Sequence, residues 1–137
     1  MAGNDIFATL PMVRRSPSSG DRGRSGGWIP NTDVYLTDQG LVIKVELAGM
    51  RREDLDLTVE ANQIRINGHR RDGCRTSQCR FVVMEINYGP FESVIELPEG
   101  YDPAHSRATY QNGFLQIDVP FAPREERTPV SVPISAD

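Results

Sequence analysis

Apolar and polar residues alternate over several short stretches of the chain from Trp28 onward. Because successive side chains of a β-strand point to opposite faces, this pattern predicts half-buried strands. Turn-forming residues separate the stretches, and no window carries a helical apolar stripe of useful length. The pattern predicts an all-β fold, an immunoglobulin-like antiparallel β-sandwich. The predicted strands are residues 33–36, 41–48, 54–60, 63–68, 91–97, 107–111 and 114–119.

The hairpin at residues 107–119 is the organising element of this pattern. Asn112-Gly113 is typical of a two-residue type I′ turn, because both residues tolerate positive φ. Folding the flanks about this turn pairs Arg107 with Asp118, an opposite-charge cross-strand pair. The same register gathers the apolar side chains on one face: Ala108, Tyr110, Leu115 and Ile117.

The composition is that of one domain with terminal extensions. The chain has 137 residues, 38% of them hydrophobic, and its ten prolines and twelve glycines disfavour long helices. A net charge of −4 gives no support for nucleic acid as a partner. No apolar run approaches the ~20 residues of a membrane span, and no signal-peptide core is found at the start. We expect a cytoplasmic protein with neither a membrane nor a nucleic-acid partner.

Residues 1–27 carry no clean strand pattern and are predicted to be a flexible N-terminal arm. Within them, residues 14–27 are rich in Gly, Ser and Arg and lack the apolar side chains needed to become ordered. The arm is either a disordered leader or an adhesive segment that binds other proteins through exposed apolar side chains. Those side chains are Ile6, Phe7, Leu10 and Met12.

The sandwich domain is predicted to span residues 28–121, followed by a C-terminal tail at 122–137. Pro133 excludes a central strand position for the tail, because proline donates no backbone hydrogen bond. The tail is either a frayed terminus or a peptide that lies along a groove or sheet edge of a neighbouring subunit. Its apolar residues alternate with small or polar ones: Val130, Val132 and Ile134.

Residues 69–80 are polar and basic, which predicts a long excursion between two strands. Cys74 and Cys79 lie in it, with His69 at its start. The cysteines are unremarkable loop thiols, a redox-responsive disulfide pair or, with His69, zinc ligands. A single C-x4-C pair is a weak metal signal, so we assign no metal site.

The sequence holds no catalytic or cofactor-binding constellation. Asp102, His105 and Ser106 are the residue types of a catalytic triad, but they lie within one turn and cannot take the separate directions that a triad needs. Phosphate-binding glycine motifs and metalloprotease motifs are absent. We expect a protein that is not an enzyme and needs no cofactor.

Motifs spread over about residues 28–134 resemble, in order, those of the small heat-shock proteins, the α-crystallin family. The hairpin sequence at 108–115 resembles the family signature A-x-x-x-N-G-V-L. Ala48 stands where the family usually has proline, and Val132 where it usually has isoleucine. The other matching motifs are Trp28-Ile29-Pro30 with Asp33-Val34-Tyr35, Leu47-Ala48-Gly49-Met50 with Glu53-Asp54-Leu55, residues 64–68, Tyr88-Gly89-Pro90-Phe91, Leu97-Pro98-Glu99 and Val132-Pro133-Ile134.

This resemblance implies an ATP-independent holdase, which binds partly unfolded client proteins and keeps them soluble. It also implies a homo-oligomer, in which sandwich domains form dimers and tails link the dimers. The tail motif that docks on a neighbour is Val132, Pro133 and Ile134. The groove between the neighbour's edge strands is then placed at Leu57, Val59, Ala108 and Tyr110. Clients would contact the arm at Ile6, Phe7, Leu10 and Met12.

The resemblance further implies that the loop at residues 70–85 carries a strand that swaps onto the partner's first strand, residues 33–36. Ile86 stands where many members have an arginine. The alternative to self-assembly is a monomeric β-sandwich co-chaperone with a dedicated protein partner, and the tail motif and the long loop favour self-assembly. The implied dimer interface is Asp33, Val34, Tyr35, Phe81, Val82, Val83 and Glu85.

Overall fold

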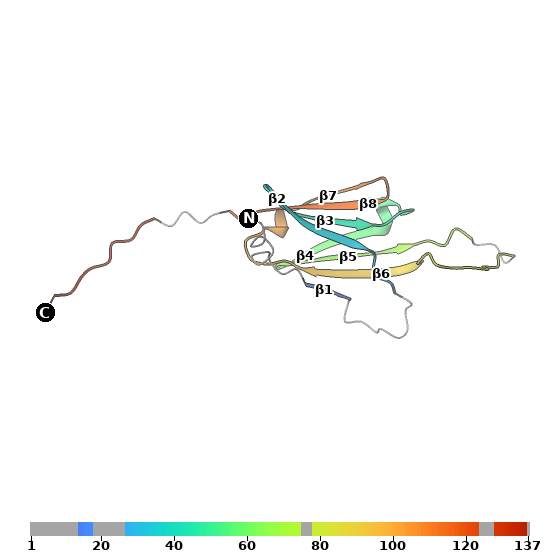
Figure 1. Cartoon of the computed structure of the whole chain (residues 1–137), viewed down its shortest axis with the longest axis horizontal. Coiled ribbons are helices and arrows are strands. Elements are labelled where there is room, and N and C mark those ends of the chain that lie inside the picture. The colour runs from blue at the N-terminus through green and yellow to red at the C-terminus, as the bar shows by residue number, and fades with distance from the viewer. Residues whose placement is uncertain (1–13, 18–26, 75–77, 124–127, 137) are drawn as a thin grey trace, which may run out of the picture.

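The computed structural model describes residues 14–17, 27–74, 78–123 and 128–136. In these ranges the chain forms two four-stranded antiparallel sheets that pack face to face (Figure 1). One sheet has the strand order β1-β6-β5-β4 and the other has the order β2-β3-β8-β7. The elements are β1 (Arg14–Pro17), β2 (Thr32–Thr37), β3 (Gly40–Glu46), the 3₁₀ turn η3 (Arg52–Asp54), β4 (Leu55–Glu60), β5 (Gln63–Arg70), β6 (Gly89–Glu96), the 3₁₀ turn η4 (Pro103–His105), β7 (Arg107–Gln111) and β8 (Phe114–Pro120).

The predicted antiparallel β-sandwich is confirmed, and each predicted strand lies within about two residues of an observed one. The largest differences are at strand ends. β3 stops before the predicted end at residue 48, because Ala48 and Gly49 form a turn in which Gly49 takes a φ of 76°. Such a backbone favours glycine, which has no Cβ to clash.

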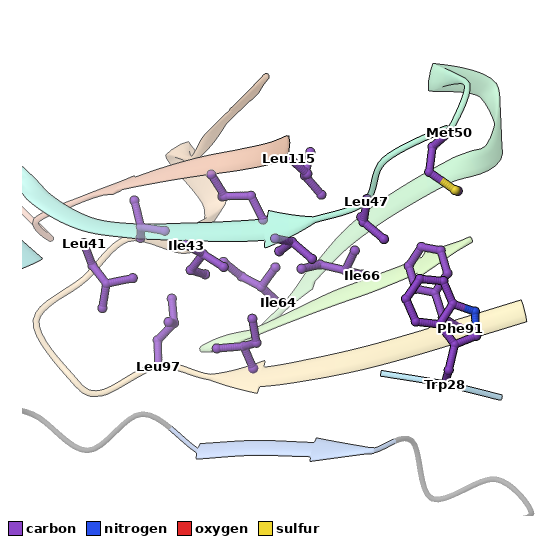
Figure 2. Close-up of a cluster of buried hydrophobic side chains, with 14 residues drawn as sticks. Trp28, Leu41, Ile43, Leu47, Met50, Ile64, Ile66, Phe91, Leu97 and Leu115 are labelled. Atoms are coloured by element: carbon purple, nitrogen blue, oxygen red, sulfur yellow. The ribbon is translucent and has the colours of Figure 1, made fainter. Parts of the chain in front are cut away.

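The hydrophobic core lies between the two sheets and is built from alternate residues of their strands (Figure 2). Ile43 from one sheet and Ile66 from the other are completely buried. Burying an aliphatic side chain of this size contributes roughly 1.5–3 kcal/mol relative to leaving it exposed. At one end of the core the rings of Trp28 and Phe91 lie 5.0 Å apart, and Trp28 Nε1 donates a hydrogen bond to the Gly89 carbonyl.

The hairpin of β7 and β8 has the predicted turn and the predicted register throughout. Asn112 and Gly113 have φ values of 54° and 82°, as a type I′ turn requires. Arg107 lies opposite Asp118, and the pairing continues without a bulge up to the turn. Leu115 and Ile117 are buried as expected, and Tyr110 packs against the core from the edge strand.

The expectation that residues 14–27 are unordered is wrong for Arg14–Pro17. These four residues form β1, which pairs with β6 in antiparallel register from Arg14 opposite Glu96 to Pro17 opposite Ser93. The pairing uses backbone hydrogen bonds at a sheet edge, which require no apolar side chains, so composition alone does not reveal it. Part of the predicted N-terminal arm therefore belongs to the sandwich, and β6 pairs with a strand along each of its two edges.

Candidate assembly site: an edge groove and an unpaired arm

β4 and β7 are the last strands of their sheets and contribute to one shared groove. Each pairs with a single neighbour within the described residues, so the outer backbone N–H and C=O groups of both strands can bind another strand. The open groove between them has a volume of about 460 Å³. It is lined by Arg52, Leu55, Asp56, Leu57, Ala108, Thr109, Tyr110 and Leu115.

The apolar part of this groove follows from the alternation of its edge strands. Leu57 points inward from β4 and is only partly buried, because no further strand of the described ranges covers that side. Ala108 faces the groove from β7, and its small side chain leaves space there. The structure thus brings together Leu57, Ala108 and Tyr110 of the predicted groove. Val59, the fourth predicted residue, lies two residues further along β4, is 40% exposed and is not among the residues that line this groove.

The hydroxyl of Tyr110 ties the groove to the turn that follows β3. It donates a hydrogen bond to the Leu47 carbonyl at 2.5 Å and accepts one from the Met50 N–H at 3.1 Å. These two bonds hold the Ala48–Gly49 turn against β7 from positions about 60 residues away in the chain. Sequence alternation predicted the ring of Tyr110 near the core but gave no signal for its hydroxyl.

Tyr110→Phe is expected to lower the free energy of unfolding by about 1–3 kcal/mol, because two backbone groups lose their hydrogen-bond partner. The measurement is urea denaturation followed by the fluorescence of Trp28, the single tryptophan. Tyr101→Phe is the matched control. Tyr101 is partly buried against the core and stacks on Phe121, and its hydroxyl makes no hydrogen bond within the part of the chain that the structure describes. Equal effects of the two substitutions would contradict the role of the Tyr110 hydroxyl.

Between β5 and β6 the chain leaves the sandwich as a long arm, residues 71–88, whose described parts, 71–74 and 78–88, project past the ends of the strands (Figure 1). Arg70 anchors the base of this arm. Its Nε donates to the Asn87 carbonyl at 2.9 Å, its Nη1 donates to the Ala48 carbonyl at 3.2 Å, and its guanidinium lies 4.2 Å from the Trp28 ring centroid. The two ends of the arm are therefore held at one corner, an anchor that sequence reasoning missed.

The arm exposes a run of apolar side chains. The exposed fractions are 46% for Phe81, 95% for Val82, 71% for Val83 and 55% for Met84. None of them joins a strand of the chain's own sheets in the described ranges. Among the described residues the implied partner strand, β2, pairs only with β3, and its outer edge carries no other strand of that part of the chain. A single chain does not bring the two halves of the implied dimer interface together: Asp33, Val34 and Tyr35 on β2, and Phe81, Val82, Val83 and Glu85 on the arm.

The tail is extended and exposed over its described residues, 128–136. Val130 is 84% exposed, Val132 78% and Ile134 93%, so they are not covered by any groove that the described residues form. The predicted client-contacting residues lie outside the described residues: Ile6, Phe7, Leu10 and Met12.

The polar residues considered as catalytic or metal-binding candidates make only local contacts in the described structure. Cys74 and Cys79 are joined by a disulfide, which was one of the three possibilities for this pair. The His105 Nδ1 lies 2.6 Å from an Asp102 carboxylate oxygen, whereas the Ser106 hydroxyl is buried and makes no hydrogen bond to any described residue. Searched over the same residues, the structure contains no cluster of three or more potential metal ligands.

The sequence model of the Hsp20/alpha crystallin family matches residues 33–135, from β2 to the end of the tail motif. The chain belongs to this family. Its members are small heat shock proteins, so membership supports a chaperone role and gives no support for catalysis. The residues that carry the match include both edge strands of the groove, the arm and the tail.

Known small heat shock proteins resemble this chain in sequence and in fold. Small heat shock protein C2 of Rickettsia felis is 30% identical over 92 residues, which are 67% of this chain and 60% of that protein. The chain spans about 60% of the length of such curated relatives. Among solved structures, hspA of Xanthomonas axonopodis gives a TM-score of 0.65 at 26% identity, over 72% of this chain and 98% of its own.

A small heat-shock protein of Xylella fastidiosa also gives a TM-score of 0.65, at 24% identity and over 80% of this chain and 98% of its own. At this level of identity the similarity supports the fold alone. Across the described ranges, no helix has the length and apolar character needed to cross a bilayer.

Proposed function

We propose that this protein is an ATP-independent holdase, which assembles as an oligomer of dimers, binds partly unfolded proteins and prevents their aggregation. The observation that carries the proposal is the combination of free strand edges with exposed apolar segments on one rigid sandwich. Val82 is 95% exposed on the arm and Ile134 is 93% exposed on the tail. Apolar surface of this kind marks sites that bind other protein chains.

The arm forms the dimer in this proposal. The arm of one subunit adds as a strand to the free outer edge of β2 in the other, and the second arm does the same in return. Strand addition satisfies the unpaired backbone groups of β2 and removes the apolar side chains of the arm from water. The side chains involved are Asp33, Val34 and Tyr35 on β2, and Phe81, Val82, Val83 and Glu85 on the arm.

The tail links dimers by lying in the groove between β4 and β7 of a neighbour. In an extended backbone the side chains of Val132 and Ile134 point the same way and are about 7 Å apart, the spacing of Leu55 and Leu57 along β4. Burying two aliphatic side chains contributes roughly 3–6 kcal/mol per tail, before the entropy of ordering the tail is subtracted. Each link is therefore weak enough to open reversibly.

Clients bind where apolar surface becomes available. Heating releases tails and uncovers the grooves, and the N-terminal arm offers its own apolar side chains. The driving force is hydrophobic burial, which requires neither nucleotide nor metal. The client-contacting residues of the N-terminal arm are Ile6, Phe7, Leu10 and Met12.

The test is suppression of aggregation without ATP. The full chain, mixed at equimolar subunits with a heat-labile enzyme, is expected to reduce light scattering several-fold at the temperature at which that enzyme alone aggregates. An inert protein at the same mass concentration is the control. No protection at equimolar subunits would contradict holdase activity.

A further inference from the structure

The disulfide between Cys74 and Cys79 lies in the arm, directly before the exposed apolar run. The two Cα atoms are 6.2 Å apart, and the residues are separated by five positions in the sequence. Cys79 is exposed and Cys74 is partly buried, so the Cys79 sulfur is the one open to attack from solvent. The Cys74 N–H donates a hydrogen bond to an Asp72 carboxylate oxygen at 2.9 Å, which fixes the backbone on one side of the bond.

The arm is restrained at two places, and the apolar run lies between them. At the base, Arg70 binds the Asn87 carbonyl. At the far end, the disulfide fixes Cys79, only two positions before Phe81. No strand pairing within the described chain restrains the residues from Phe81 to Met84. The covalent bond is therefore the restraint that acts on this run from its N-terminal side.

We propose that the Cys74–Cys79 disulfide is a redox switch for dimerisation, an inference that rests on the proposed function of the arm. With the bond closed, the arm has fewer conformations to lose when Phe81–Met84 orders on the partner's β2. With the bond open, the same contacts form at a larger cost in conformational entropy. Oxidation therefore strengthens the dimer, and reduction weakens it.

The switching step is a thiol–disulfide exchange with a small monothiol as the co-reactant. The thiolate of the monothiol attacks the Cys79 sulfur and forms a mixed disulfide, and the Cys74 sulfur leaves as a thiolate and takes up a proton. A second monothiol attacks the sulfur of the first and releases the Cys79 thiolate, which is protonated in turn. The protein gains two electrons and two protons, and the two monothiols become one oxidised disulfide.

Subunit exchange tests the proposal. Isotope-labelled and unlabelled full-length chains are mixed, and the formation of mixed dimers is followed by native mass spectrometry with and without a monothiol reductant. Reduction is expected to speed exchange about tenfold in the native chain, because losing the restraint on the arm acts mainly on the rate at which the dimer dissociates. The matched control is Cys74→Ser/Cys79→Ser, which is expected to exchange as fast as the reduced native chain whether or not reductant is present.

Each result bears on a different step. Equal exchange rates in the oxidised and reduced native chain overturn the switch and leave the dimer intact. A response of the double-serine variant to reductant also overturns it, because the effect would then not pass through these cysteines. Alkylation of both cysteines in the air-oxidised chain without prior reduction overturns the disulfide. A chain that stays monomeric in both redox states overturns the proposed dimer itself.

Discussion

Val132→Ser/Ile134→Ser is expected to reduce the assembly to dimers at micromolar concentration. Both side chains are almost fully exposed in the single chain, so the substitutions remove no contact within the fold. In the assembly they remove two buried aliphatic groups per tail, a loss of roughly 3–6 kcal/mol, which weakens each link by at least about a hundredfold. The measurement is molar mass by size-exclusion chromatography with light scattering.

The tail and the groove each provide a control. Ser131→Ala/Ser135→Ala alters the opposite edge of the tail and is expected to leave the mass unchanged. Ala108→Gln fills the groove from an exposed position and is expected to give the same dimers as the tail variant, with little effect on stability. A mass that neither Val132→Ser/Ile134→Ser nor Ala108→Gln lowers would contradict tail docking. A monomeric mass in every variant would instead favour a co-chaperone with a dedicated partner.

A substitution of Val130 distinguishes the two registers in which the tail can dock. It lies two residues before Val132 on the same edge of the tail, so the pair Val130 and Val132 could occupy the groove in place of Val132 and Ile134. Val130→Ser alone is expected to leave the mass unchanged if the second pair docks. Because Val130 is 84% exposed in the free chain, folding itself does not depend on it.

Local chemistry explains why the hairpin of β7 and β8 was predicted in full. The Asn112-Gly113 turn defines the pairing, and a shift of one residue would move Leu115 and Ile117 out of the core. The same alternation turns Leu57, Ala108 and Tyr110 toward the core side, but only the resemblance to the small heat-shock proteins predicted that β4 and β7 share a groove. Features that follow from a two-residue periodicity or from a turn type can be predicted from a few neighbouring residues.

Other features depend on contacts between distant parts of the chain and leave no local pattern. β1 forms through backbone pairing with β6, and its composition is that of an unordered segment. The hydroxyl of Tyr110 and the guanidinium of Arg70 bind carbonyl groups that belong to turns and loops elsewhere. Only the fold decides which carbonyl a side chain reaches, so these anchors were outside the reach of sequence reasoning.

Gly40→Ala is expected to lower the free energy of unfolding by about 3 kcal/mol or more. A Cβ at this position would lie 2.1 Å from the Val119 carbonyl oxygen and 3.1 Å from the Pro120 Cα, and φ is 150°. Both neighbours are backbone atoms of β8, so no side chain can rotate away to make room. β3 and β8 would have to separate where Gly40 pairs with Pro120. Urea denaturation followed by Trp28 fluorescence measures the change.

Two other glycines serve as references for this loss. Gly73→Ala is expected to change stability by less than about 0.5 kcal/mol, because its Cβ would meet nothing within 4 Å. Gly49→Ala meets nothing either but has a φ of 76°, so its cost of about 1 kcal/mol measures backbone strain alone. The excess of Gly40→Ala over Gly49→Ala then combines the contact with β8 and the larger backbone cost of alanine at a φ of 150°. If there were no excess, the close approach of the strands would not constrain this position. Gly40 also follows the turn that leads out of β2, so the same variant should weaken the edge on which the arm of a partner is proposed to dock.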